Sequence, residues 1–286
     1  MTLNVLFKQF ILDKEYITGL STNTITNYKK SFSAFCKHTE PDSDSGMLTK
    51  HRLNEFVINC RKANMTPRTL NSYIANLNVF LGWLFQNQHI TEPLKLKRVK
   101  EEKKVQRRFT EDELNKLISF KPTNFFESRL LALICTVIDT GIRIDEALTL
   151  TRDRVDFANL LIKVIGKGKK ERIIPISHEL RKVMFKYLKS HNFNLVFPTR
   201  TGGKQDYTNA WQDFRRLCNK LGIKRTGFHA FRRTYAKQYV RDGGNLFYLQ
   251  ASLGHSNLQT TKTYVEVEIE DLQVTHLKTS LLSRLK

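Results

Sequence analysis

The chain has 286 residues, 40% of them apolar, so it is long and apolar enough to bury the core of one large domain or of two ordinary ones. Residues 1–108 hold 18 basic and 9 acidic side chains, hence +9, and residues 109–286 hold 30 and 18, hence +12, which gives the formal net charge of +21. Such an excess can serve solubility alone, but its presence in both halves favours a polyanion that touches both, and nucleic acid is the commonest one.

The composition argues against a membrane or disulfide-stapled protein. No stretch approaches the roughly 18 apolar residues of a membrane span, and the start "MTLNVLFKQF" lacks the order of charged, apolar and small residues of a secretory signal. The four cysteines lie far apart, without a Cys-x-x-Cys pair that would suggest zinc. We therefore expect a cytoplasmic protein with no membrane partner.

Helical patterns fill the first ninety residues. Apolar residues recur at helical spacing from Thr22 to about Lys37. The stretch "TPRTLNSYIANLNVFLGWLFQ" opens with Thr66 as an N-cap and Pro67 at the first helical position. Residues 1–94 are thus predicted to form a small helical domain. Residues 95–108, with eight basic residues, two acidic ones and no apolar periodicity, predict a solvated linker that is also suited to lie along phosphates.

A second domain is predicted over residues 109–286. Thr110 and Glu113 have the spacing of a capping box, and "LLALICTVIDTG" is apolar nearly all round, as a buried helix that stops at Gly141 would be. The segments "LLIKVI" and "RIIPIS", separated by the turn-like "GKGKKE", predict a hairpin of two strands, and "NAWQDFRRLCNKLGI" predicts an amphipathic helix. The predicted fold is mainly α with a small antiparallel β-sheet in the second domain.

Several residues of this second domain are suited to hold a phosphate. Arg143 follows a glycine that ends a buried helix, although an arginine beside Asp145 and Glu146 is also typical of an ion pair at a helix start. His229 and Arg232 are three residues apart, hence on one helical face near a helix N-terminus, where backbone N–H groups favour anions.

Two further motifs carry candidates. In "GKGKKER", Lys167 lies between glycines at the hairpin tip, from which a flexible charged side chain can reach across a cleft; the spacing is not that of a phosphate-binding P-loop. In "LGHSNLQTTKTY", His255 precedes Tyr264 by nine positions. Taken alone, the last stretch is more typical of a surface turn followed by an aromatic residue that caps a helix.

Together these motifs resemble the tyrosine recombinases, the phage-integrase and Xer-type family, across nearly the whole chain. The specific signal lies between Phe109 and Val267: Thr-Gly-x-Arg with Glu146 three residues on, Gly-Lys-Gly, His-x-x-Arg, Leu-Gly-His and the tyrosine nine positions later. The helical first domain is similar to the family's core-binding domain in length and pattern. The resemblance implies the compact two-domain form, without an additional arm-binding domain, in a bacterial protein that is associated with DNA.

The resemblance also implies the chemistry. Tyr264 is the expected nucleophile that becomes joined to a DNA 3′-phosphate, and Arg143 and Arg232 are expected to hold the non-bridging oxygens. His255 is expected to donate a hydrogen bond to the same phosphate, while His229 assists proton transfer with Tyr264. Lys167 is the candidate general acid for the departing 5′-hydroxyl, and Glu146 is expected to orient Arg143 or His229. No metal site and no cofactor are expected.

The expected partner is double-stranded DNA with inverted recognition sites, bound by a monomer or dimer on single sites and by a homotetramer in the synaptic complex. A helix over about residues 268–286 is predicted either to dock on a neighbouring protomer or to pack on its own domain. Integration or excision, resolution of transposon cointegrates and resolution of replicon dimers remain open as roles, as do accessory sites or proteins and the target sequence. A type IB topoisomerase and a silent DNA-binding relative are the alternative functions.

Overall fold

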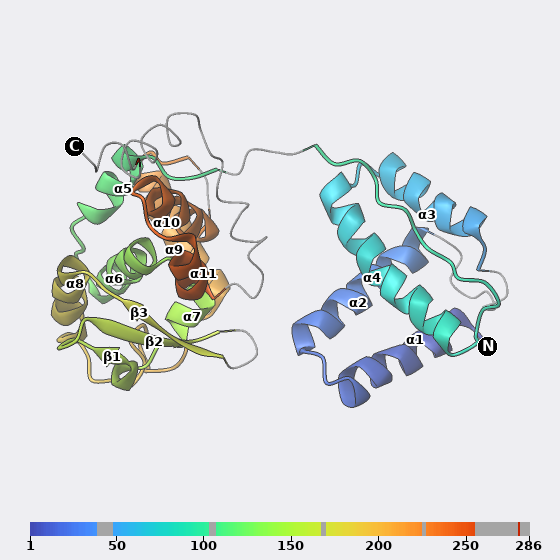
Figure 1. Ribbon diagram of the computed structural model, residues 1–286, viewed down its shortest axis with the longest axis horizontal. Helices are drawn as coiled ribbons and strands as arrows, with labels where there is room; N and C mark the ends of the chain where they lie inside the picture. Colours follow the sequence, from blue (N-terminus) through green and yellow to red (C-terminus); the bar gives the residue numbers. More distant parts are fainter. Residues whose placement is uncertain (39–47, 103–106, 167–169, 225–226, 255–279, 281–286) are drawn as a thin grey trace. The chain divides into compact units, whose positions relative to one another are not determined.

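The computed structural model describes residues 1–38, 48–102, 107–166, 170–224, 227–254 and 280. Contacts divide the chain into two compact units, Met1–Lys104 and Val105–Lys286, each with its own hydrophobic core (Figure 1). Helices dominate both units and the second holds a small antiparallel sheet, so the predicted fold class is confirmed. Within the described ranges, no helix combines the length and apolar character that a membrane span requires.

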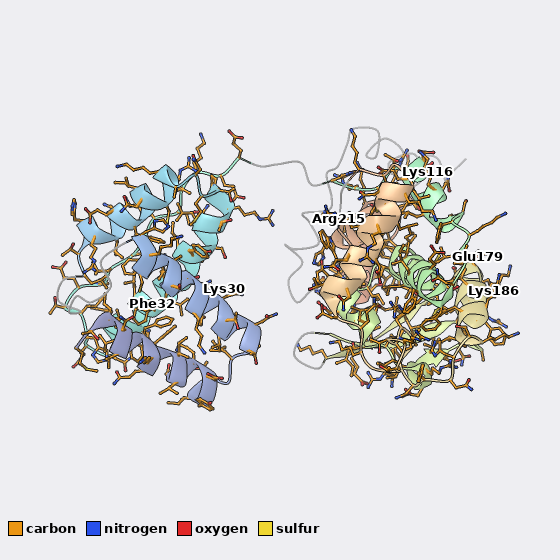
Figure 2. All side chains as sticks on the ribbon, turned by 180° about the vertical axis from the view of Figure 1, so that it is seen from behind. Lys30, Phe32, Lys116, Glu179, Lys186 and Arg215 are labelled. Atoms are coloured by element: carbon orange, nitrogen blue, oxygen red, sulfur yellow. The ribbon has the colours of Figure 1, made fainter. Side chains whose placement is uncertain are left out.

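The first unit is a helical bundle. It contains α1 (Leu3–Leu12), the π-helical turn η1 (Asp13–Ile17), α2 (Thr22–His38), α3 (Lys50–Lys62) and α4 (Pro67–Gln86). The predicted N-cap is confirmed, because the Thr66 side chain accepts a hydrogen bond from the backbone N–H of Thr69. Phe7 stacks on Phe32 with ring centroids 3.9 Å apart, and on α2 Lys30 points away from this aromatic core (Figure 2).

The segment after α4 differs from the sequence prediction. Leu96 is 3% exposed and belongs to the core of the first unit. Asn78 on α4 accepts from the Leu96 N–H at 2.8 Å and donates to its carbonyl at 3.0 Å, and Asn71 pairs in the same way with Val99. The prediction of a solvated linker is therefore wrong for Leu96, which is buried, and for Val99, which is half-buried, whereas Lys97 and Arg98 between them are exposed. Two asparagine side chains satisfy the backbone of Leu96 and Val99 and let these two residues pack on the first unit.

The second unit is built around one buried helix, which other helices surround, and it also contains a small sheet. Its elements are α5 (Glu111–Ile118), α6 (Phe125–Thr140), α7 (Ile144–Leu148), η3 (Arg152–Arg154), β1 (Val155–Asp156), β2 (Leu161–Ile165), β3 (Glu171–Pro175), α8 (His178–Leu188), α9 (Tyr207–Lys220), α10 (His229–Arg241) and α11 (Leu246–Leu253). Helix α6 packs against α5, α8, α9 and α10, which explains its apolar character all round (Figure 1). The predicted capping box of Thr110 and Glu113 begins α5.

The sheet has the strand order β1-β2-β3, with both pairs antiparallel. Ile162 on β2 lies opposite Ile174 on β3, and both are buried, so one face of the hairpin joins the core. The hairpin was predicted, whereas the two-residue strand β1 was not, because so short a segment carries no periodicity. The predicted assembly helix over about 268–286 falls outside the described residues except for position 280.

Candidate active site

The end of α6 positions Arg143. Gly141 adopts a left-handed conformation with φ +62°, and a Cβ atom there would lie 2.4 Å from a ring carbon of Tyr235, so glycine is needed for both conformation and space. Arg143 follows as the N-cap of α7, and its backbone N–H donates to Glu146 Oε2 at 2.8 Å. Its Nη1 donates to Glu146 Oε1 at 2.9 Å. The helix-start ion pair weighed from the sequence is thus present, and it holds the guanidinium in place.

Helix α10 begins at His229 and carries Arg232 one turn later, as predicted. Arg232 is buried, and its guanidinium donates to the carbonyl of Gly141 at 2.9 Å and to that of Leu253 at 2.6 Å. The side chain therefore joins three elements, because those carbonyls lie at the ends of α6 and α11. A charged group held this firmly loses little entropy when it meets a ligand.

Arg143 and Arg232 converge on one backbone carbonyl. Nη1 of Arg143 lies 3.4 Å from the Leu253 oxygen, a long hydrogen bond, and Nη2 of Arg232 lies 2.6 Å from the same atom. The structure therefore brings together the Thr-Gly-x-Arg motif and the His-x-x-Arg motif, whose arginines are almost ninety positions apart in the sequence. Two neighbouring guanidinium groups have the charge and the donors that suit a phosphate or another oxyanion.

Glu146 lies buried behind Arg143. Each of its carboxylate oxygens accepts two hydrogen bonds, one from Arg143 and the other from Arg172. Burial alone would raise the pKa of this carboxyl, but the hydrogen bonds from Arg172 and from the Arg143 backbone outweigh burial and hold the pKa below its usual 4.5. Glu146 is therefore ionised at neutral pH. It contacts Arg143 and, in the part of the chain that is described, makes no hydrogen bond to His229.

His229 lies at an exposed position at the start of α10. Desolvation of the imidazole by the surrounding protein lowers its pKa below 6.5, and the positive charges of Arg233, Arg232 and Arg143 lower it further. The side chain is therefore mainly neutral at neutral pH, which is the form that accepts a proton.

Arg172 is a site residue that the sequence reasoning missed. It comes from β3 and donates to both oxygens of Glu146, with Nη1 at 3.0 Å and Nη2 at 2.8 Å. A signal was present, because Arg172 and Ile174 are two positions apart and hence share one face of the strand. Since Ile174 faces the core, a charged residue beside it requires a buried partner.

Three predicted catalytic residues, Lys167, His255 and Tyr264, lie outside the described residues. The described residues directly before Lys167 and His255, Gly166 and Gly254, have defined positions in the fold. The Gly166 N–H donates to the Lys170 carbonyl at 2.8 Å across the base of the hairpin that carries Lys167. Gly254 ends α11 in a left-handed conformation directly before His255.

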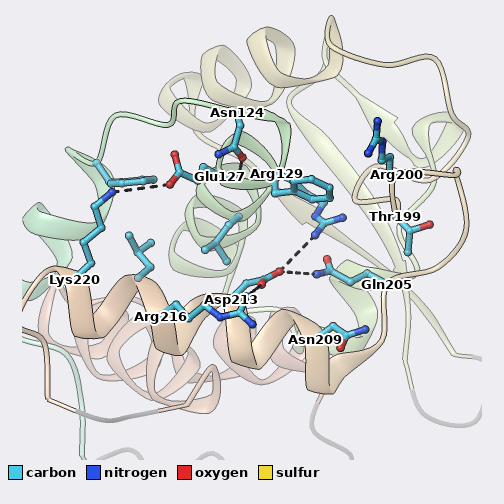
Figure 3. Close-up of a pocket in the computed structure, with 14 residues that line it drawn as sticks. Asn124, Glu127, Arg129, Thr199, Arg200, Gln205, Asn209, Asp213, Arg216 and Lys220 are labelled. Carbon is cyan, nitrogen blue, oxygen red and sulfur yellow. Dashed lines mark hydrogen bonds and ion pairs between the residues drawn. The ribbon is translucent and has the colours of Figure 1, made fainter.

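A cavity of about 570 Å³ lies in the second unit between α6, α9 and residues 199–205 (Figure 3). Arg129 crosses it to Asp213 at 3.5 Å and donates to the Pro198 carbonyl at 2.6 Å, and Gln205 lies 3.4 Å from Asp213. These contacts tie α6 to α9. None of Arg143, Glu146, His229 or Arg232 lines this cavity, so it is separate from the arginine site. Over the described ranges, no group of three or more His, Cys, Asp or Glu residues is arranged to hold a metal ion.

Two family models match the chain. The model of the phage integrase family matches residues 107–270, and the model of the phage integrase N-terminal SAM-like domain matches residues 7–88. The chain belongs to the phage integrase family. The resemblance to tyrosine recombinases drawn from the sequence motifs is thereby confirmed, and Arg143, Glu146, His229 and Arg232 all lie within the match to the phage integrase model.

Curated tyrosine recombinases are similar to this chain over most of their length. The tyrosine recombinase XerA of Thermococcus kodakarensis is 29% identical over 84% of this chain and 85% of its own. A tyrosine recombinase of Thermosipho africanus is 30% identical over 86% and 89%. Tyrosine recombinase XerD of Listeria innocua is 26% identical over 87% and 89%. The similarity thus spans both units.

Solved structures of two integrases share the fold. The Tn1549 transposon integrase in complex with circular intermediate DNA superposes with a TM-score of 0.81 at 19% identity, covering 96% of this chain and 99% of that one. A lambda integrase dimer bound to a COC′ core site superposes with a TM-score of 0.77 at 16% identity, covering 94% and 100%. At these identities the likeness concerns the fold alone.

Proposed function

We propose that this chain is a site-specific DNA recombinase that cleaves and rejoins double-stranded DNA through a covalent 3′-phosphotyrosyl intermediate at Tyr264. The observation that supports it most is the convergence of Arg143 and Arg232 on the Leu253 carbonyl, two residues before His255. Family membership supports the same conclusion, since the curated relatives are tyrosine recombinases.

The proposed reaction begins with attack by the Tyr264 hydroxyl on a phosphodiester. His229 accepts the hydroxyl proton, and the new phosphorus–oxygen bond to Tyr264 replaces the bond to the 5′-oxygen, which takes a proton from Lys167. Arg143 and Arg232, with a hydrogen bond from His255, stabilise the negative charge on the non-bridging oxygens. The phosphotyrosyl bond preserves the energy of the broken backbone. A 5′-hydroxyl from a second DNA molecule can therefore reverse the reaction without ATP, which exchanges the strands.

The proposed substrate is a pair of double-stranded sites with inverted recognition sequences, held by a homotetramer. The DNA complexes of the Tn1549 transposon integrase and lambda integrase support a DNA substrate, and the lambda integrase complex is a dimer. We assign the docking between neighbouring protomers to the segment 268–286. Integration, excision and resolution share this chemistry, and covalent trapping on fragmented DNA followed by sequencing would identify the target.

The proposal is tested with a DNA site that carries a nick near the cleavage position, so that cleaved strands dissociate and the adduct accumulates. The parent protein should form a denaturant-resistant protein–DNA adduct, and Tyr264→Phe should bind DNA with nearly the parent affinity but form none, because only the hydroxyl is lost. Tyr248→Phe, at an exposed tyrosine of α11, is the matched control and should form the adduct at the parent rate.

An adduct in Tyr264→Phe would show that another residue is the nucleophile. On a supercoiled plasmid with two intact sites, relaxed circles without recombinants would indicate a topoisomerase. Binding of the nicked site by the parent protein without an adduct would indicate a silent DNA-binding relative.

A further inference from the structure

Arg172 connects three parts of the site through one guanidinium. The side chain lies on β3 and is 12% exposed. Nη1 and Nη2 bind the two oxygens of Glu146, at the start of α7, and Nε donates to the Ser252 carbonyl in α11 at 2.7 Å. A planar fork that binds a carboxylate with two parallel hydrogen bonds fixes both distance and orientation, which a lysine cannot do.

Two glycines leave room for this guanidinium. A Cβ atom on Gly254 would lie 3.0 Å from Nη1 of Arg172, and one on Gly166 would lie 3.2 Å from the same atom and 3.4 Å from Oε1 of Glu146. These glycines are the residues directly before His255 and Lys167. The Arg172 guanidinium therefore lies against Gly254 and Gly166, the residues that precede His255 and Lys167. It also binds the Glu146 carboxylate, which in turn binds Arg143.

We propose that Arg172 is a positioning residue that holds the β2–β3 hairpin, the end of α11 and the Glu146–Arg143 pair in fixed positions relative to one another. This inference rests on the proposed function, because it assigns Lys167 and His255 to the reaction. Arg172 acts through its neighbours rather than on the DNA, because its guanidinium donates to the Glu146 carboxylate and the Ser252 carbonyl. Without the two hydrogen bonds from Arg172, the Glu146 carboxylate is free to rotate, and Arg143 then has no partner in a fixed position.

The test compares Arg172→Lys with the parent in single-turnover cleavage of the nicked site at saturating protein. The variant keeps the charge but loses the fork. We expect cleavage to fall by about 10- to 100-fold, the usual effect of removing a group that orients a reacting one, while the dissociation constant for DNA stays within about threefold. Arg154→Lys is the matched control, because its contact with Glu171 is a looser one of 3.8 Å, and it should cleave at the parent rate.

A second readout separates positioning from general support of the fold. Arg143 and Arg172 are the charged groups that face Glu146 among the described residues. In Arg172→Gln the pKa of the Glu146 carboxyl should rise, as followed by carbon NMR, and the decline of cleavage at acidic pH should begin at a higher pH than in the parent. A purely structural role would lower the melting temperature, DNA affinity and cleavage together, without changing the shape of the pH profile.

Three outcomes have distinct meanings. Parent-like cleavage by Arg172→Lys, or an unchanged titration of Glu146 in Arg172→Gln, overturns the inference. Parallel loss of folding, affinity and cleavage overturns it as well and makes Arg172 a support of the fold. Absence of an adduct from the parent protein overturns the proposed function instead, and the Glu146 titration still reports whether Arg172 controls that carboxyl. A fall in cleavage with retained affinity and a raised pKa supports the inference.

Discussion

His229 illustrates how a single residue is tuned by its surroundings. Its imidazole begins α10, where desolvation and three neighbouring arginines disfavour the charged form and lower the pKa. Arginines that are suited to hold a phosphate thus also keep the nearby histidine neutral. In the proposed reaction, one cluster of positive charge therefore serves both anion binding and proton acceptance.

The pH dependence of cleavage follows from this shift. A histidine with a lowered pKa is deprotonated above that pKa and gains a proton only as the pH falls through it, below 6.5. Single-turnover cleavage should therefore be level near about pH 7.5 and should decline in the acidic range. His229→Gln should cleave more slowly and lack this decline, whereas Glu146, with a pKa held below 4.5, titrates at lower pH. An unchanged acidic decline in His229→Gln would assign it to another group.

At the scale of elements, the junction of α6 and α7 determines where Arg143 and Arg232 lie. Gly141 ends α6, its carbonyl accepts from Arg232, and Arg143 follows two residues later. The ring of Tyr235 on α10 fills the space where a Cβ atom of residue 141 would be. The stability of the second unit and the positions of Arg143 and Arg232 therefore depend on the same turn at Gly141.

We expect Gly141→Ala to lower the free energy of unfolding by roughly 2–4 kcal/mol, because it adds both left-handed strain and overpacking. Cleavage should fall as well, since α10 must move away from the new methyl group. Chemical denaturation of the full chain measures the first effect. Gly203→Ala is the control, because its Cβ atom would lie 3.4 Å from a single side-chain oxygen of Thr199, and its stability should stay within about 1 kcal/mol of the parent. Equal stability of the two variants would contradict the argument.

The β2–β3 hairpin carries the proposed general acid. Lys167→Ala should slow cleavage of ordinary DNA by about 100-fold or more, and cleavage should recover on DNA with a 5′-bridging phosphorothiolate, because a thiolate leaves without a proton. Lys163→Ala removes an exposed lysine of β2, 3.8 Å from Glu171, and should behave like the parent on both substrates. Equal impairment of Lys167→Ala on both substrates would give Lys167 a binding role.

Elements with strong local signals could be predicted from the sequence, and contacts between distant residues could not. Caps at Thr66 and Thr110 and the stop at Gly141 are encoded within a few residues. The packing of Leu96 depends on an asparagine eighteen residues earlier. Leu94, Leu96 and Val99 are too few apolar residues among the basic ones to show a helical periodicity. The position of Arg172 beside Ile174 on β3 predicts a buried partner, but the identity of that partner appears only when β3 meets α7 and α11.

At the scale of the whole molecule, both units are basic and each has its own core. Residues 1–104 hold 16 basic and 9 acidic side chains, and residues 105–286 hold 32 and 18. If both units bind phosphates, the affinity for DNA should fall by about 10³–10⁵ between 50 and 200 mM salt, the loss expected for six to ten phosphate contacts.

The contribution of the first unit can be measured by cutting the chain between the units. The fragment 105–286 keeps the whole core of the second unit, whereas a cut after residue 94 would leave Leu96 and its neighbours without the helix on which they pack. We expect the logarithm of its DNA affinity to depend less steeply on the logarithm of salt concentration, by about 0.9 for each phosphate that residues 1–104 neutralise in the full chain. Circular dichroism checks that the fragment is folded, and titrations over a series of salt concentrations give both slopes. A folded fragment with the slope of the full chain would mean that residues 1–104 do not contact phosphates, and their basic side chains would then serve solubility rather than DNA binding.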